Sequence, residues 1–285
     1  MFRKNFPILI LLFFCSLALQ AQQLVLYGTN EYSYKFELLQ HALSYHPEKK
    51  YQLVGFKNEI PKHRAFDFMN DRNAIDIIFG GATIYRESIS LPVRIPILKG
   101  LNGWRMPIIN KSKKDLFTTI DSISSFKDLV PGQYYSWSDT KILESNGIEI
   151  AKGSDYEGLF QMLDKNRFDY FPRSVLEIEN DYNARKHLNI MIDPTTLIHY
   201  PTAYYFFVAK ENKTLHEDIS FGLQQAIADK SFDKIFNKYY GEIIATIMNK
   251  NKKVFLLNNP LLPKQTPLSE KHLWVDLSQN STIVH

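Results

Sequence analysis

The stretch IDIIFGGATIYRESISLPVRIPILKGLNGWRMPII, residues 75–109, decides the fold that the chain can adopt. It begins with Ile75–Phe79, a short apolar and β-branched run that predicts a buried strand. Gly80 and Gly81 follow, and glycine lets a backbone turn sharply and approach a ligand closely. Arg86 then offers a permanent cation with a planar fork that suits a carboxylate or a phosphate. The stretch therefore predicts a buried strand that ends at an anion-binding site.

Strands and helices alternate in the residues before this stretch. Leu24–Tyr27 and Tyr51–Phe56 are predicted as strands, and helices are predicted from about Tyr32 to Ser44 and from Pro61 to Met69. Such alternation implies a mostly parallel sheet with both faces covered. Ligands of such sheets bind beyond the carboxyl ends of the strands, which is where Gly80, Gly81 and Arg86 lie.

After Arg86 the chain is predicted to run outward in extended form. Val93–Leu98 and Trp104–Ile109 are both typical of extended segments, and the aromatic run Tyr200–Ala209 has the same character. We expect these segments to carry the chain from one lobe to a second lobe and back. Hinge motion is expected at Trp104–Ile109 and at Tyr200–Val208.

A second polar and aromatic group is predicted between a strand at Gln133–Trp137 and a helix at Lys141–Ser145. It comprises Trp137, Ser138, Asp139 and Thr140. These residues are candidate ligand contacts at a helix start. Two structural alternatives stay open: Asp139 caps the helix, and Trp137 belongs to the core.

A further strand, within Arg167–Arg173, is predicted to end at Pro172-Arg173. Arg86 and Arg173 are assigned to opposite walls of one cleft, as exposed side chains whose loss leaves folding almost unchanged. The alternative for Arg173 is an ion pair with Glu177, four residues along the next predicted helix.

The order of these elements resembles the type II periplasmic solute-binding proteins, especially the amino-acid-binding branch (solute-binding family 3) and its uncharacterised subfamilies. The resemblance implies an α/β fold of two lobes, each with a mixed, mostly parallel sheet, joined by two hinge crossovers around a ligand cleft. It places Glu31, Tyr32 and Tyr34 at a loop that opens onto the cleft; the alternative for Glu31 is a favourable position at a helix start. The closing helices Leu215–Ala228 and Ser231–Tyr240 closely resemble the family's last pair.

The chain departs from that family at two points. Relatives have a glycine-containing loop where this chain has Trp137 and Asp139, and they often end the later strand with an Asp that binds an amine where this chain has Arg173. The departures favour an anionic ligand over a free amino group. The resemblance implies a protein that traps a small anionic or zwitterionic solute for amino-acid-type transport by an ABC permease, or for a membrane sensor. It also implies a monomer that is not an enzyme.

The predicted organisation has four parts. Residues 1–21 are a signal peptide, 22–106 the first part of lobe 1, 107–199 lobe 2, and 200–285 the return crossover and the completion of lobe 1. Helices after the return crossover are expected to pack on lobe 1. The Pro-rich tail from Lys252 to His285 is expected to lie over lobe 1 as an irregular strap.

The first residues predict secretion to the periplasm. Arg3 and Lys4 precede a short apolar run, and cleavage is expected after Ala21. Phe14 before Cys15 argues against lipidation, so the mature chain would contain no cysteine. Loss of Arg3 and Lys4 takes the formal charge from +4 to +2, which gives no reason to expect nucleic acid as a partner.

Motifs of the common catalytic and metal sites are missing from the sequence. The eight histidines show no metal spacing, and there is no GxSxG, Walker or GxGxxG motif, so no metal or cofactor is expected. Two alternatives to a binding protein stay open. One is a periplasmic dehydratase or lyase on the same scaffold, with Glu31 or Asp139 as the acid or base. The other is an adaptor that binds no ligand.

Overall fold

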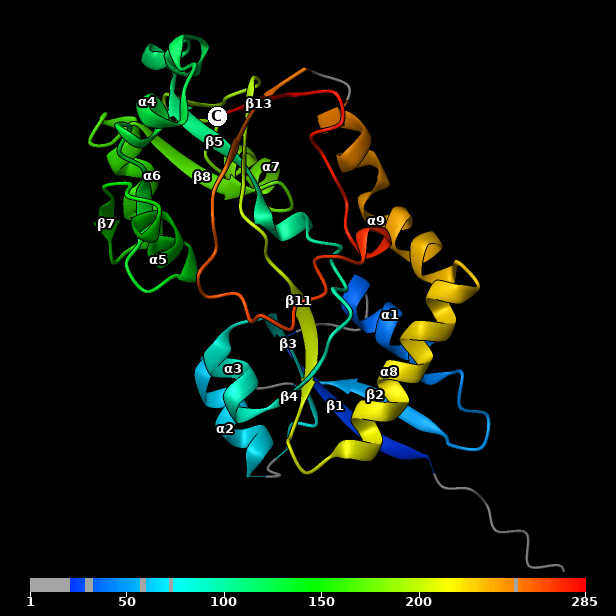
Figure 1. Ribbon diagram of the computed structural model, residues 1–285. Coiled ribbons are helices and arrows are strands. Elements are labelled where there is room, and N and C mark those ends of the chain that lie inside the picture. Colours follow the sequence, from blue (N-terminus) through cyan, green and yellow to red (C-terminus); the bar gives the residue numbers. More distant parts are fainter. Residues whose placement is uncertain (1–20, 29–32, 57–59, 72–73, 249–250) are drawn as a thin grey trace, which may run out of the picture.

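The computed structural model describes residues 21–28, 33–56, 60–71, 74–248 and 251–285. In these ranges the chain forms two α/β lobes, drawn one above the other in Figure 1. No helix in the described ranges is long and apolar enough to cross a membrane. The predicted signal peptide falls outside these ranges except for its last residue.

Lobe 1, the lower one in Figure 1, is built on a five-stranded sheet in the order β2-β1-β3-β11-β4. Strands β1 (Gln22–Tyr27), β2 (Tyr51–Gly55) and β3 (Ile77–Gly81) run parallel. β11 (Tyr204–Val208) is antiparallel to β3, and β4 (Leu91–Val93) is antiparallel to β11. Every residue of β3 is buried, as expected for an apolar strand inside a sheet that is covered on both faces.

Helices cover both faces of this sheet. α1 (Tyr34–Leu43), α8 (Lys213–Ala228) and α9 (Ser231–Met248) share one buried cluster with the strands, and α2 (Lys62–Asn70) shares another on the opposite face. α3 (Ile84–Ile89) follows β3 directly and carries Arg86. The alternating pattern of the sequence thus produces the covered, mostly parallel sheet that was predicted.

Lobe 2 contains a six-stranded sheet with the path β13-β12-β10-β5-β8 and with β9 beside β5. β5 (Trp104–Asn110) lies in its middle, antiparallel to β8 (Tyr170–Ser174), β9 (Ile190–Ile192) and β10 (Thr196–His199). One buried cluster joins this sheet to α4 and α5, and a second joins it to α6 and α7. The remaining elements of the lobe are α4 (Ile123–Lys127), α5 (Ser138–Ser145), α6 (Tyr156–Asp164), α7 (Ile178–Asn183) and the paired strands β6 (Gly132–Tyr134) and β7 (Ala151–Gly153).

Two segments connect the lobes, but the predicted hinge stretches are mostly strands: Trp104–Ile109 belongs to β5 of lobe 2, and Tyr204–Val208 is β11 of lobe 1. Residues 94–103 lead from β4 in lobe 1 to β5 in lobe 2, and residues 200–203 lead from β10 back to β11. The 3-10 turn at Leu101–Gly103 shortens the first of them. Gly103 is required here because a Cβ would lie 2.3 Å from the carbonyl oxygen of Tyr200, so the two crossovers touch.

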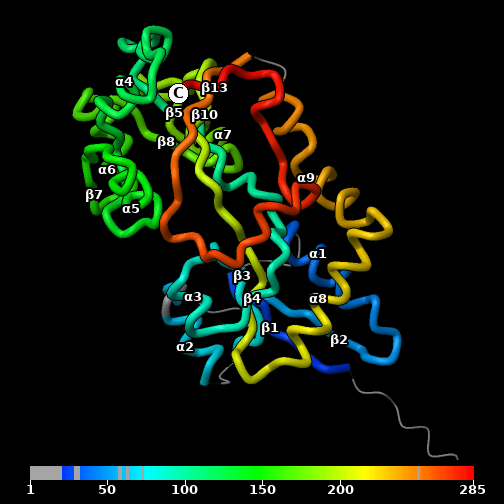
Figure 2. Tube along the Cα trace, in the orientation of Figure 1, coloured from blue at the N-terminus to red at the C-terminus, as the bar shows by residue number. Residues whose placement is uncertain are grey.

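The C-terminal tail differs from its prediction. β12 (Lys253–Leu256) and β13 (Thr282–Val284) extend the lobe 2 sheet in parallel with β10, and only the segment between them reaches lobe 1. Figure 2 shows this segment descending from lobe 2, turning near β3 and β4, and returning. The expected strap over lobe 1 is therefore a strap that joins both lobes. We call residues 257–281 the strap.

Two further elements differ from the predictions. The extended run predicted after Arg86 begins only at β4, because Thr83 caps α3 by accepting the Arg86 N–H and this helix continues to Ile89. The helix predicted after Arg173 covers only Ile178–Asn183, with turns on either side.

Candidate functional site

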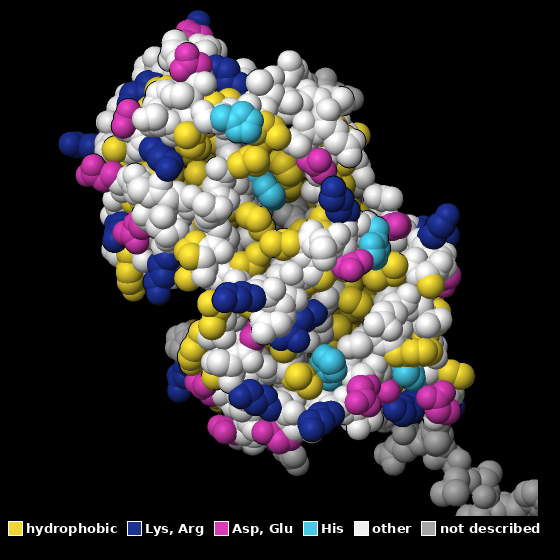
Figure 3. All heavy atoms as spheres, viewed as in Figure 1, with side chains coloured by type: hydrophobic (Ala, Val, Ile, Leu, Met, Phe, Trp, Pro, Cys, Tyr) yellow, Lys and Arg dark blue, Asp and Glu magenta, His cyan; other side chains and the backbone are white. Residues whose placement is uncertain are grey.

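A cavity of about 470 Å³ lies between the two lobes. In Figure 3 the molecule narrows between the lobes, and Lys or Arg side chains lie on the lobe 1 side of the notch. Both lobes, the return crossover and the strap contribute to its walls. Its lining residues are Gly81, Ala82, Thr83, Arg86, Asn102, Arg105, Ser136, Trp137, Ser138, Asp139, Ile142, Arg173, Glu177, Thr202, Tyr204, Asn259 and Leu261.

Arg86 is placed at this cavity by the turn after β3. Its Nη1 donates to the carbonyl of Gly81 at 2.7 Å, and its guanidinium lies 5.7 Å from the centre of the Phe66 ring. Among the described residues no carboxylate lies within ion-pair distance of it. Burial lowers the pKa of Arg86 from its usual value. The guanidinium is therefore half-buried, cationic and not neutralised, as an anion-binding group would be.

Gly81 fits between this arginine and the return crossover. A Cβ at Gly81 would meet the Tyr204 ring at 3.3 Å and Nη1 of Arg86 at 3.4 Å. A side chain there would crowd both of them, so Gly81 lets Tyr204 and Arg86 come close to the backbone, while its approach to a ligand stays a prediction.

Arg105 is the second residue of β5 and is only 6% exposed. Its Nη2 is 2.5 Å from Oδ1 of Asp139, which also accepts from the Tyr200 hydroxyl. Burial alone would lower the pKa of Arg105, but the Asp139 carboxylate raises it above its usual value. Its Nε is buried without a hydrogen-bond partner among the described atoms. Asp139 is thus occupied by a cation and a hydroxyl rather than free to act as a base.

Arg173 lines the opposite wall but is held by lobe 2 itself. It is 6% exposed; its Nε donates to Asp181 at 2.6 Å and its Nη2 to Glu177 at 2.8 Å. Its guanidinium carbon lies 4.9 Å from the Trp137 ring centre and 5.3 Å from that of Tyr156. The structural alternative, an ion pair with Glu177, is therefore formed. The expectation of an exposed Arg173 without a folding role is corrected.

The Trp137–Thr140 segment divides between cavity and core. Trp137, Ser138 and Asp139 line the cavity, and Trp137 precedes α5 without making a side-chain cap. Asp139 lies inside the first turn, so it is not the N-cap. Thr140 is buried and donates to the Tyr134 carbonyl at 2.8 Å, which anchors α5 rather than a ligand.

The structure brings together most of the predicted contacts. Gly81, Arg86, Asp139 and Arg173 meet at the cavity with Trp137 and Ser138, whereas Thr140 points away. Tyr34 is buried and donates to the Ile97 carbonyl at 2.6 Å, so it supports the first crossover instead. The predictions for Glu31 and Tyr32 lie outside the described residues.

Several cavity residues were not predicted. Arg105 is flanked by apolar residues in the strand sequence. A charged residue among apolar neighbours was the only feature that could have indicated a place in the site. Tyr204 belongs to the aromatic return segment, where no residue was singled out. Asn259 and Leu261 come from the tail, which was predicted to lie over lobe 1 and not between the lobes.

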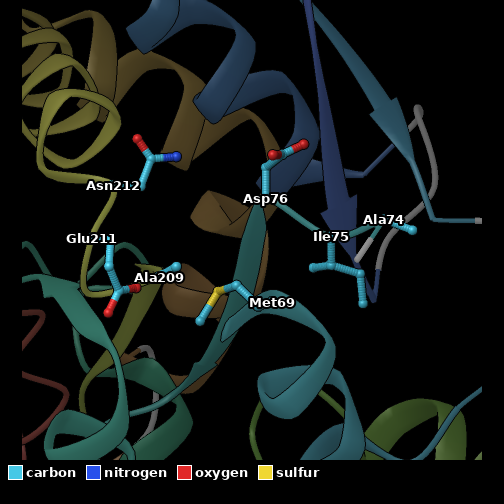
Figure 4. Close-up of a pocket in the computed structure, with 7 residues that line it drawn as sticks. All are labelled: Met69, Ala74, Ile75, Asp76, Ala209, Glu211 and Asn212. Carbon is cyan, nitrogen blue, oxygen red and sulfur yellow. The ribbon is translucent and has the colours of Figure 1, made fainter. Parts of the chain in front are cut away.

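A second hollow lies at the other end of the lobe 1 sheet (Figure 4) and has about 400 Å³. Its polar groups include Asp76, whose carboxylate accepts a hydrogen bond from the Val25 N–H at 2.8 Å. Burial raises the pKa of Asp76 above its usual value. No basic side chain lines it among the described residues, and it adjoins the start of β3, away from the carboxyl ends where ligands of such sheets bind. The lining residues are Met69, Ala74, Ile75, Asp76, Ala209, Glu211 and Asn212. The described residues also contain no His, Cys, Asp or Glu group that could hold a metal ion.

Comparisons with known proteins support the fold. No family model and no curated protein matches the chain. Among solved structures, the probable amino-acid ABC transporter extracellular-binding protein ytmK of Bacillus subtilis is 18% identical, with a TM-score of 0.56 over 78% of this chain and 99% of that one. An ancestral arginine-binding protein bound to arginine is 15% identical, with a TM-score of 0.54 over 76% and 98%. A structure from work on glutathione import by GshT and the cystine importer TcyBC of Streptococcus mutans is 14% identical, with a TM-score of 0.55 over 78% and 96%. The chain has the two-lobed fold of these proteins.

Proposed function

We propose that this protein is a secreted, periplasmic solute-binding protein that traps a small anionic or zwitterionic molecule between its lobes. The observation that carries the proposal is Arg86, a half-buried guanidinium in the interlobe cavity with no carboxylate partner among the described residues. A cation kept from water without a counter-ion is costly, and an anionic ligand group would relieve that cost.

Both lobes supply groups that a bound solute would touch. Arg86 and Thr83 come from lobe 1, and Trp137 and Ser138 come from lobe 2. A ligand that contacts both lobes stabilises the state in which they are close, so closure is a population shift toward that state. A cavity of about 470 Å³ suits a small organic molecule.

The fold and the predicted secretion support a role in solute transport or sensing. The similar structures include proteins described as extracellular binding proteins of ABC transporters. The partner of this chain is then an ABC permease that receives the solute or a membrane sensor that reads its occupancy, with the binding protein acting as a monomer.

The test is direct binding. Protein purified under mild conditions is analysed by mass spectrometry for a bound solute, and that solute is titrated calorimetrically against wild type, Arg86→Met and Arg94→Met. Arg94 is the matched control, because it belongs to the same lobe but pairs with Glu87 at 2.6 Å away from the cavity. Loss of a charge-assisted hydrogen bond costs roughly 1.5–3 kcal/mol, so Arg86→Met should bind about ten to a hundred times more weakly. Equal affinity of Arg86→Met and wild type would contradict the proposal.

A further inference from the structure

We propose that the solute is an organic carboxylate that carries no free ammonium group. This inference rests on the proposed function and narrows its ligand class. It comes from the way in which the charges at the cavity are paired.

Every described carboxylate at the cavity already has a guanidinium partner. Asp139 lies 2.5 Å from Arg105 and also accepts from Tyr200. Glu177 lies 2.8 Å from Arg173. A ligand ammonium would therefore have to share an acid with an arginine, and like charges side by side are unfavourable.

The positive side of the cavity has the opposite character. Nη1 of Arg86 is used by the Gly81 carbonyl, while its Nε and Nη2 have no hydrogen-bond partner among the described atoms. Nε of Arg105 is buried and also unpaired. Two guanidiniums thus have donors without partners, and each carboxylate among the described lining residues is already paired with an arginine. The cavity is complementary to a carboxylate.

The remaining walls are mixed, because Thr83, Asn102, Ser136, Ser138, Thr202 and Asn259 contribute polar groups beside four larger apolar or aromatic side chains. Ile142 and Leu261 contribute aliphatic surface, and Trp137 and Tyr204 contribute aromatic surface. One side of the Trp137 ring is occupied by the Arg173 guanidinium at 4.9 Å. An apolar part of the ligand is therefore expected to lie against these four side chains, with its carboxylate at Arg86.

Matched pairs of ligands test this class. L-phenylalanine is compared with 3-phenylpropanoate, and L-leucine with 4-methylpentanoate, by calorimetry on the chain from Gln22 and on Arg86→Met. In each pair the compound without the amine should bind at least ten times more tightly, and Arg86→Met should weaken its binding at least tenfold. Tighter binding of the amino acids would overturn the ligand class and leave the proposed function intact. Binding of none of the four would overturn the ligand class, while a co-purified solute would still decide the proposed function.

A second inference concerns the strap and rests on separate contacts. We infer that the strap holds the two lobes at a set separation. On the lobe 2 side, Asn146 at the end of α5 exchanges two hydrogen bonds with Asn258: its Nδ2 donates to the Asn258 carbonyl at 2.8 Å, and its Oδ1 accepts the Asn258 N–H at 2.9 Å.

The strap then binds the return crossover and lobe 1. Nδ2 of Asn259 donates to the Pro201 carbonyl at 2.8 Å, and the Leu261 carbonyl accepts the N–H of Ile84, the first residue of α3, at 3.2 Å. On its way back the N–H of Val275 donates to the carbonyl of Lys99 in the first crossover at 2.8 Å.

These contacts restrict the rotation of the lobes that the two crossovers alone would allow. Rotation of the lobes about residues 94–103 and 200–203 moves α3 relative to α5, and the strap bonds both helices within four residues, Asn258 to Leu261. Opening or closing must therefore break the bonds at Asn146 or at Ile84. The strap acts as a third connection that resists hinge motion.

Spin labels across the cleft measure this restraint. The chain from Gln22 has no cysteine, and Tyr85 and Tyr135 are 67% and 58% exposed, so Tyr85→Cys and Tyr135→Cys accept labels. A protease site inserted between Lys264 and Gln265, both exposed, lets the strap be cut in the folded protein. The label distances should be narrowly distributed before cleavage and clearly broader after it, and Asn146→Ala in the uncut chain should broaden them partly. An identical distribution in cut, uncut and Asn146→Ala protein, with circular dichroism unchanged, would overturn the inference.

Discussion

Replacement of Arg173 by Met should destabilise the protein strongly, whereas replacement of Arg86 by Met should not. Arg173 is 6% exposed and joins Asp181 at 2.6 Å and Glu177 at 2.8 Å. Removing one partner of a buried ion pair leaves the other charge uncompensated, which typically costs about 3–5 kcal/mol. Glu177 is half exposed and can return to water. The main cost therefore falls on Asp181, whose side chain is 13% exposed.

The size of the stability loss in Arg173→Met depends on the contacts that Asp181 retains in that variant. Its Oδ1 still accepts from the Tyr156 hydroxyl at 2.6 Å and lies 3.9 Å from Arg185. These contacts place the expected loss near the lower end, about 3 kcal/mol in the free energy of unfolding. For a chain of this size that is roughly 6–12 °C in melting temperature. Arg86→Met gives up one hydrogen bond to Gly81 and no ion pair, so its loss should be about 1 kcal/mol.

Thermal and urea unfolding of the two variants, without ligand, decide between these expectations. Equal small shifts for both variants would refute the view that Arg173 is a structural cation and Arg86 a ligand group. A shift for Arg173→Met that disappears in the double variant Arg173→Met, Asp181→Asn would support it, because the uncompensated charge is then gone.

Three other properties can be predicted. Burial holds the pKa of His199 at about 4, below its usual 6.5, so the unfolded chain takes up a proton at a higher pH than the folded chain does. The free energy of unfolding should therefore fall by up to about 1.4 kcal/mol per pH unit as the pH drops from 6.5 toward 4. His199→Phe should remove this pH dependence in urea titrations. Gly222→Ala should destabilise strongly because its Cβ would lie 1.9 Å from the Ala42 carbonyl oxygen, while Gly241→Ala, with 3.7 Å to its nearest neighbour, should stabilise α9 by up to about 1 kcal/mol in the same assay. Exported protein should begin at Gln22 in N-terminal analysis, and a lipid-modified N-terminus would contradict this.

The strands of lobe 1 could be predicted because their signal is local. Apolar β-branched runs such as Ile75–Phe79 have few alternatives to a buried strand, and the two glycines and Arg86 that follow were correctly placed at its carboxyl end. The helix α3 was missed although Thr83 is a good cap, because no element was predicted between Gly81 and the extended segment at Val93.

The tail and the charge pairing could not be predicted in the same way. β12 pairs with β10, more than fifty residues earlier, and nothing in four residues of sequence specifies such a partner. Arg105 depends on Asp139 in another element, and Arg173 depends on Asp181 as well as on Glu177. Whether an arginine serves folding or binding is a property of its neighbours in space, and the sequence provided only the pair four residues apart.

The charge of the ligand therefore cannot be inferred from the number of arginines at the cavity. Arg105 and Arg173 are fixed by carboxylates and aromatic rings, and they remove the acids that an ammonium would need. Arg86 is fixed by a backbone carbonyl, which orients the guanidinium without neutralising it. Because a neutral acceptor holds Arg86 in place before any ligand arrives, an incoming carboxylate meets an oriented cation and spends little free energy on ordering it. The same division explains why Arg173 should control folding and Arg86 should control binding, although both face one cavity.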